Sequence, residues 1–149
     1  MDVKFINSGL RLSFVLLLML AFRAWAADPA PPKDVAGRAW VLVQLNGEEA
    51  DATIRSTVEF APDSRASGTT GCNRWFGTAM FDGSSLVFSG VGATRMACPQ
   101  AAMDREAAFT RMLGQVRSWK IAKERLALSG EEGAPLAVFR PEAPSKGRR

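Results

Sequence analysis

The sequence contains no histidine, no tyrosine and only two cysteines among its 149 residues. Without histidine the chain can form neither a Ser-His-Asp triad nor a Cys-His nucleophile pair, and it has no histidine ligand for a metal. Two cysteines are also too few for a structural zinc site with four such ligands. These absences exclude most classes of hydrolase and metalloenzyme. We therefore predict no catalytic residues, no metal site and no cofactor.

The long apolar runs that a membrane protein needs are also missing. The longest run, residues 14–22, is about half the ~20 residues of a membrane-spanning helix. It follows the positive residues Lys4 and Arg11 and precedes Ala24-Trp25-Ala26, a small-residue cleavage site. We predict a cleaved secretory signal peptide over residues 1–26, with an uncleaved anchor as the alternative. No cysteine near this site is available for lipidation, and we therefore expect no stable membrane insertion of the mature chain.

The charges are nearly balanced once the signal peptide is removed. Residues 1–26 contain three of the 19 basic and one of the 15 acidic residues, which leaves 16 basic and 14 acidic. The basic residues are scattered along the chain, apart from the C-terminal tail. A concentrated basic surface is what binding to nucleic acid requires. We therefore predict no nucleic-acid partner, and we expect a monomer.

Short apolar runs and turn residues dominate the mature chain. The runs recur every eight to twelve residues, as in antiparallel sheets, and Asn46-Gly47 is a strong turn signal. One of the expected strands covers residues 93–97. Residues 100–116 change to a helical period, with an apolar stripe of Phe109, Met112, Leu113 and Val116.

The pattern predicts an α+β fold, in which a single curved, partly closed antiparallel sheet of about seven or eight strands packs against one amphipathic helix. Proline and polar residues at the two ends set the expected boundaries. We predict a proline-rich leader over residues 27–39, one domain over residues 40–140 and a disordered tail over residues 141–149.

Cys72 and Cys98 have three interpretations. In an oxidising compartment two cysteines favour a structural disulfide, which would contribute about 3 kcal/mol by constraining the unfolded chain. A reactive thiol is the second interpretation, and it needs a positive or helix-terminal environment. Arg74 and Arg95 are near in sequence but do not establish one. Two buried free thiols are the third. Compartment and count favour the disulfide.

The residues beside the cysteines are candidates for a contact surface. Asn73 adjoins Gly71-Cys72 and fits a left-handed turn position. Strand alternation sends Trp75 and Phe76 to opposite faces, so one belongs to the core and the other is exposed. An exposed aromatic beside Arg74 could bind a partner, although a core-and-loop role is the simpler interpretation.

The second cysteine lies in the segment Thr94 to Pro99. Arg95 joins the candidate interaction residues, with Glu59 and Asp82 as two available carboxylate partners. Met96 is expected to fill the core.

Together these segments resemble the META domain family, which includes the heat-shock protein HslJ. The resemblance rests on Trp40-x-Leu42-x-x-Leu45-Asn46-Gly47, the block from Gly68 to Gly77, Thr94-Arg95-Met96-Ala97-Cys98-Pro99, Glu106-x-x-Phe109-x-x-x-Leu113-x-x-Val116, and the apolar runs at 126–128 and 136–139. Trp119 stands where the family usually has tyrosine, and the lipidation cysteine of many members is absent.

The resemblance implies a small α+β domain outside the cytoplasm, associated with heat shock and envelope stress, with no established catalytic activity. We therefore expect a non-enzymatic periplasmic protein with a role in the stress response. The alternative is a periplasmic binding module, either a protein inhibitor or a carrier of a small apolar ligand. Its partner would be an envelope protein or a small ligand.

Overall fold

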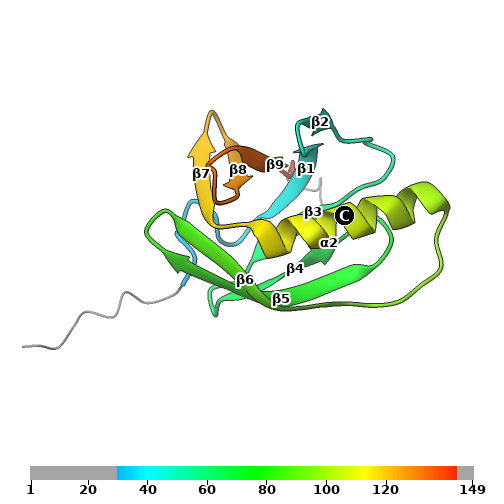
Figure 1. The fold of residues 1–149 in the computed structure, drawn as a ribbon. Coiled ribbons are helices and arrows are strands. Elements are labelled where there is room, and N and C mark those ends of the chain that lie inside the picture. Colours follow the sequence, from blue (N-terminus) through cyan, green and yellow to red (C-terminus); the bar gives the residue numbers. More distant parts are fainter. Residues whose placement is uncertain (1–29, 144–149) are drawn as a thin grey trace, which may run out of the picture.

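The expected apolar runs form β-strands in the computed structural model, which describes residues 30–143 (Figure 1). Turn residues separate the strands, and Asn46 and Gly47 both have positive φ, as the Asn-Gly signal predicted. In chain order the elements are β1 (Ala39–Leu45), β2 (Glu48–Glu49), β3 (Thr57–Phe60), β4 (Arg65–Thr69), β5 (Arg74–Asp82), β6 (Ser85–Ala93), α2 (Gln100–Gln115), β7 (Ser118–Ala122), β8 (Arg125–Ser129) and β9 (Pro135–Pro141).

The strands form one antiparallel sheet that closes into a ring. Its order is β2-β1-β3-β4-β5-β6-β7-β8-β9, and β1 also pairs with β9. The predicted fold class, α+β with one curved antiparallel sheet and one helix, is confirmed. Within residues 30–143 the sheet has nine strands instead of seven or eight, because Glu48 and Glu49 form a two-residue strand against β1.

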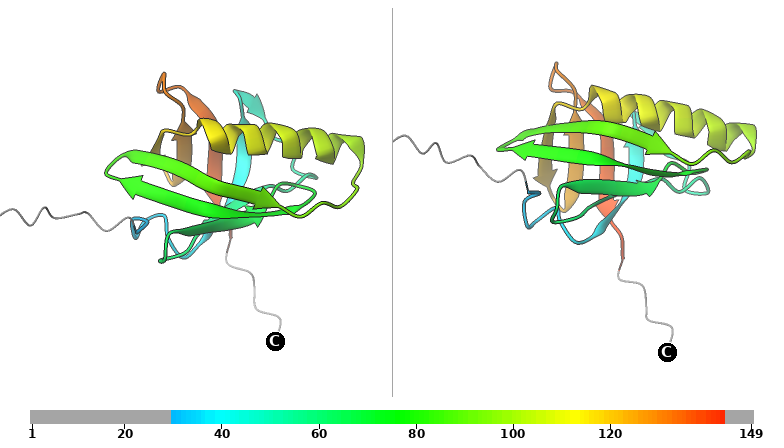
Figure 2. Two further views of the ribbon diagram at one scale, coloured as in Figure 1. Left: turned by 60° about the horizontal axis from the view of Figure 1, so that its bottom comes forward. Right: turned by 90° about the horizontal axis from the view of Figure 1, so that it is seen from below.

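The ring has its shortest strand pairing between β6 and β7, where the register contains a single pair, Ser85 with Ser118. A hydrogen bond from the Leu86 N–H to the Arg117 carbonyl (3.0 Å) continues this seam. Helix α2 joins these two strands in the chain and runs alongside β6 (Figure 1, Figure 2). A helix beside a sheet edge shields backbone groups that could otherwise pair with another chain.

Large apolar side chains fill the interior of the ring. On β5, Trp75 and Phe81 are buried whereas Phe76 and Met80 are exposed, as strand alternation requires. The Trp75 ring centroid lies 6.0 Å from that of Phe109 on the helix. Other large, fully buried side chains are Trp40, Val58, Phe60, Leu86, Leu126, Leu128 and Phe139.

Helix α2 completes the core on the side of the seam. The predicted apolar stripe is confirmed, because Phe109, Met112, Leu113 and Val116 are each at most 1% exposed. The helix itself ends at Gln115, one residue before the predicted end. Within residues 30–143 no helix is both long and apolar enough to cross a membrane.

Both ends of the described chain pack against the sheet. Val35, in the predicted leader, is fully buried, and its carbonyl accepts a hydrogen bond from the Trp40 indole (3.0 Å). At the other end the Glu142 N–H donates to a carbonyl of β1 (2.8 Å). Packing therefore extends beyond residues 40–140 in both directions. The predicted signal peptide, residues 1–26, lies outside the described residues, as does most of the predicted tail.

Candidate functional site

The two cysteines join the turn between β4 and β5 to the segment that leads into α2. Cys72 lies in that turn, and Cys98 immediately precedes Pro99 at the start of the helix. The two residues form a disulfide with their Cα atoms 5.9 Å apart. The structure thus contains the predicted bond, and no free cysteine remains within residues 30–143.

Asn73 holds the same two segments together by hydrogen bonds. Its Oδ1 accepts from the Met96 N–H (2.7 Å) and the Thr94 hydroxyl (3.0 Å). Its Nδ2 donates to Glu106 Oε1 (3.2 Å) and Cys72 Sγ (3.3 Å). The residue is only 1% exposed. One buried amide therefore bonds three separate parts of the chain. We call this cluster the Asn73 junction, and it consists of Thr70, Cys72, Asn73, Thr94, Met96, Cys98 and Glu106.

Glu106 of α2 is the charged member of the Asn73 junction. Its Oε2 accepts hydrogen bonds from the Thr70 hydroxyl (2.6 Å) and the Asn73 N–H (3.2 Å). The Thr70 bond is the main cause that lowers the Glu106 pKa below its usual 4.5, and the Asn73 bonds add to it while partial burial opposes it. Glu106 is consequently an anion at neutral pH.

Three local predictions for this region are wrong. The positive φ falls on Gly71 (109°) and not on Asn73, and a Cβ added at Gly71 would also lie 2.5 Å from Ile54 Cγ2. Residues 94–97 form no strand, because β6 ends at Ala93. Met96 is 57% exposed and does not fill the core. The disulfide and the Asn73 hydrogen bonds hold residues 94–97 in place, so this segment is fixed without burial of the Met96 side chain.

Arg74 and Arg95, the two arginines among the candidate interaction residues, are both exposed. The ion pairs within residues 30–143 are Arg55 with Glu142 and Arg65 with Asp63. Arg95 therefore pairs with neither of the carboxylates that the sequence offered.

The exposed aromatic of β5 is Phe76. It is 58% exposed, whereas Trp75 is 2% exposed and donates its indole N–H to the Thr57 carbonyl (2.9 Å). Met80 (45% exposed) lies further along the same face, opposite Val87 of β6 (37%). We call Phe76, Met80 and Val87 the outer patch.

A groove of about 560 Å³ adjoins the outer patch beside Phe76. Its walls include Ser67 and Thr78 together with Arg65, so the apolar ring sits among hydroxyl groups and one cation. Arg74 precedes Phe76 by two residues on β5, which places both on the outer face. Of the candidate interaction residues, Arg74, Phe76 and Arg95 are exposed, whereas Asn73 and Trp75 are buried.

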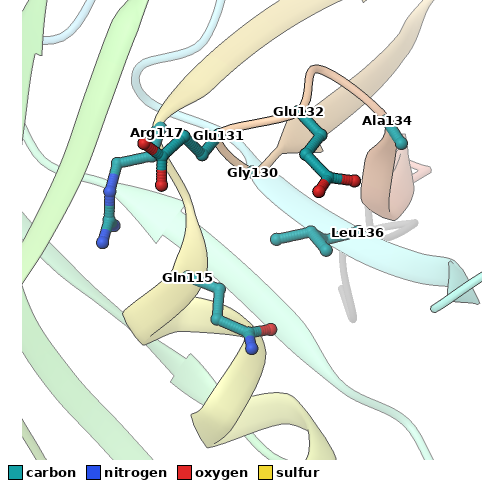
Figure 3. A pocket seen from close by; sticks show the side chains of 7 residues that line it. All are labelled: Gln115, Arg117, Gly130, Glu131, Glu132, Ala134 and Leu136. Atoms are coloured by element: carbon teal, nitrogen blue, oxygen red, sulfur yellow. The ribbon is translucent and has the colours of Figure 1, made fainter.

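Another groove, of about 580 Å³, lies at the C-terminal end of α2 (Figure 3). Gln115, Arg117, Gly130, Glu131, Glu132, Ala134 and Leu136 line it. The Arg117 guanidinium donates to the carbonyls of Gly114 (3.1 Å) and Val116 (2.7 Å), so it caps the helix end. Arg117 is the one basic side chain among these lining residues, and its guanidinium is engaged with those two carbonyls.

Sequence reasoning missed Glu106 and Thr70, which belong to the Asn73 junction. The helical period offered one signal, because Glu106 lies three residues before the buried Phe109 and therefore near the face that packs against the sheet. Within residues 30–143 no group of three or more cysteine, aspartate or glutamate side chains is placed to hold a metal ion.

Three solved structures share this fold. An NMR structure of a protein from Burkholderia xenovorans is 24% identical, with a TM-score of 0.61, and covers 81% of this chain and 94% of its own. A second NMR structure is 20% identical (TM-score 0.60; 74% and 93% covered). A crystal structure of a DUF4847 family protein from Bacteroides vulgatus is 15% identical (TM-score 0.54; 71% and 93%). At these identities the similarity supports the fold alone.

A search of curated proteins gives no match. The model of the META domain matches residues 33–143, which include all the strands and the helix of the described part of the chain and both cysteines. The chain therefore belongs to the META domain family.

Proposed function

We propose that this chain is a non-enzymatic, exported protein of the cell envelope that acts in the stress response by binding a partner protein through its outer patch. Membership of the META domain family supports a small non-catalytic domain. The disulfide supports an oxidising compartment outside the cytoplasm, because such bonds persist there.

The exposure of Phe76 is the observation that carries this proposal. A phenylalanine that is 58% exposed leaves most of its apolar surface in water, on the same face of the sheet as Met80 and Val87. Aromatic and arginine side chains supply most of the energy at protein interfaces, commonly ~2 kcal/mol or more for each anchor. Phe76 and Arg74 offer that combination on one face.

A carrier of a small apolar ligand is the competing function, and it needs an open apolar cavity inside the sheet. The inward positions are occupied by large side chains, among them Trp40, Trp75, Phe109 and Phe139, each at most 2% exposed. The filled interior favours a protein partner over such a ligand.

The test is restoration of stress tolerance in a host that lacks the gene. Phe76→Ser and Arg74→Ala should each reduce survival after heat or envelope stress without lowering the amount of folded protein. Phe76→Leu, which keeps an apolar side chain, and Arg125→Ala, an exposed arginine on β8, are the matched controls. Full restoration by Phe76→Ser would contradict binding through the outer patch.

Export is tested separately. The mature protein should begin at Ala27 and should be recovered from the periplasmic fraction, as the signal pattern predicts. An intact N-terminus in a cytoplasmic fraction would contradict export.

A further inference from the structure

The disulfide is accessible to reagents and partners. Cys72 and Cys98 are both partly exposed. Two methionines lie beside them: Met103 Sδ is 3.8 Å from Cys72 Sγ, and the Met96 carbonyl is 3.6 Å from the same sulfur. Both methionine side chains are themselves exposed, by 37% and 57%. Flexible thioethers at a surface accommodate varied apolar partners.

Cys98 stands at the positive end of α2. The helix has 16 residues, its N-cap is Pro99, and it has neither a side-chain cap nor an acidic residue in its first turn. Within the described chain no protein group accepts the N–H of Gln100 or Ala101. An uncompensated helix N-terminus stabilises a neighbouring anion, and it is one of the environments that lower a cysteine pKa. The structure thus supplies the helix-terminal environment that a reactive thiol needs.

The two cysteines differ in their surroundings. Cys72 Sγ shares the Asn73 amide with the Glu106 carboxylate, so an anion there would face a second anion across one hydrogen-bond donor. Arg105 of α2 is engaged with the Ile54 carbonyl, while Arg74 and Arg95 extend into solvent. These charges favour the thiolate at Cys98 and the neutral thiol at Cys72.

The fold does not depend on the bond to keep the two sulfurs adjacent. Asn73 Oδ1 binds the Met96 N–H and the Thr94 hydroxyl, and the Thr94 N–H binds the Arg74 carbonyl (2.9 Å). These bonds join the two cysteine segments without involving sulfur. A pair that stays in place when reduced can form its bond again, which is the requirement for a reversible couple.

We propose that Cys72–Cys98 is an exchangeable disulfide that oxidises a dithiol partner, with Cys98 as the leaving thiolate. A partner thiolate attacks Cys72 Sγ, which forms a mixed disulfide and releases Cys98 as a thiolate stabilised by the helix. The second partner thiolate then attacks the partner sulfur of the mixed disulfide and displaces Cys72, which takes up a proton. The partner loses two electrons and two protons. The chain gains both electrons and one of the protons, and the other goes to solvent. Attack at Cys72 is favoured because exchange is faster when the departing thiol has the lower pKa.

The first measurement is reduction of the native protein by dithiothreitol, followed by alkylation and mass spectrometry. The bond should open at least about tenfold faster than the chain unfolds globally, and circular dichroism should stay native. Bond opening only at the rate of global unfolding would overturn the proposal. This measurement needs no variant, so it remains decisive if the cysteine variants fold poorly.

The second measurement tests whether Cys98 is the cysteine that is stabilised as a thiolate. In Cys72→Ser the alkylation rate of Cys98 is followed against pH, and its pKa should lie well below the ordinary ~8.5 of a free cysteine. Adding Gln100→Glu puts a carboxylate in the first turn and should raise the Cys98 pKa, so that alkylation measured at a pH below that pKa slows by about two- to fivefold, which corresponds to the helix-terminal effect of one charge. Gln115→Glu, the same change at the other end of α2, is the matched control. An ordinary Cys98 pKa, or equal effects of the two glutamates, would overturn the proposal.

Discussion

The aromatic interior and the Asn73 junction stabilise the same fold in different ways. In the interior the stabilisation is spread over many large side chains. Trp75, for example, lies against two other rings, with centroid distances of 5.9 Å to Phe88 and 6.0 Å to Phe109. In the Asn73 junction a single amide bonds the β4–β5 turn, the segment before α2 and the helix. Apolar packing tolerates substitutions of similar volume, whereas a hydrogen-bond network tolerates only the correct arrangement of donors and acceptors. The interior should therefore be robust to conservative changes, and the junction should not.

Removing an aromatic from the interior should have the largest effect. Trp75→Ala deletes contacts with two rings and the indole bond to Thr57, and should lower the free energy of unfolding by about 4–5 kcal/mol. Phe76→Ser, one residue away but on the outer face, is the matched control and should change it by less than about 0.5 kcal/mol. Urea unfolding measures both. Equal losses would mean that the two faces of β5 are not distinguished by packing.

Asn73→Ala should come next, with a loss of about 3–4 kcal/mol, because several buried partners lose their hydrogen bonds at once. Asn73→Asp sharpens the comparison. It keeps the acceptor but places a second carboxylate against Glu106, so repulsion raises a folded-state pKa and stability should recover as the pH falls below about 5. Urea unfolding at pH 7 and pH 4.5 measures this. If the Asn73→Asp variant is less stable at the lower pH, the assigned contact with Glu106 is contradicted.

The disulfide should matter somewhat less than Asn73. Cys72→Ser combined with Cys98→Ser should lower the free energy of unfolding by about 3 kcal/mol, which is the chain-entropy cost of freeing a loop of this length. The near-ultraviolet dichroism of the variant should remain native, because the Asn73 bonds persist. Loss of the native spectrum would show that the covalent bond, and not the amide, organises the junction.

Glu106 should give the smallest effect, and the effect should depend on pH. Its pKa is lowered in the folded protein, so the stabilisation is present above the ordinary value of 4.5 and is lost as the pH falls through the folded-state value. Glu106→Gln should cost about 1–2 kcal/mol at pH 7 and flatten the acid limb of the stability profile. An unchanged acid limb would assign the pH dependence to another carboxylate.

The interior was predictable from the sequence because apolar periodicity reports burial directly. The stripe on residues 109–116 and the alternation of Trp75 and Phe76 are both present in the structure. The Asn73 junction was not predictable in the same way. Its partners lie up to 36 residues apart, and a buried asparagine has the same local pattern as one in a turn. Met96 is exposed because hydrogen bonds to Asn73, which the sequence pattern does not reveal, hold its segment. Short-range patterns identify apolar surfaces well but do not identify the partners of polar groups.

The pairing of β1 with β9 has a consequence for the order of events during synthesis. Strand β1 can pair with β9, its longest neighbour, only after residues 135–141 have been synthesised. Until then Leu42 and Leu45 of β1 lack the cover of Phe139 and Ala137, their partners in the register. A chain cut before β9 would keep its apolar residues exposed and could not close the ring. A chain that lacks β9 would therefore be more prone to aggregate, because unpaired strand edges and exposed apolar side chains promote association between chains.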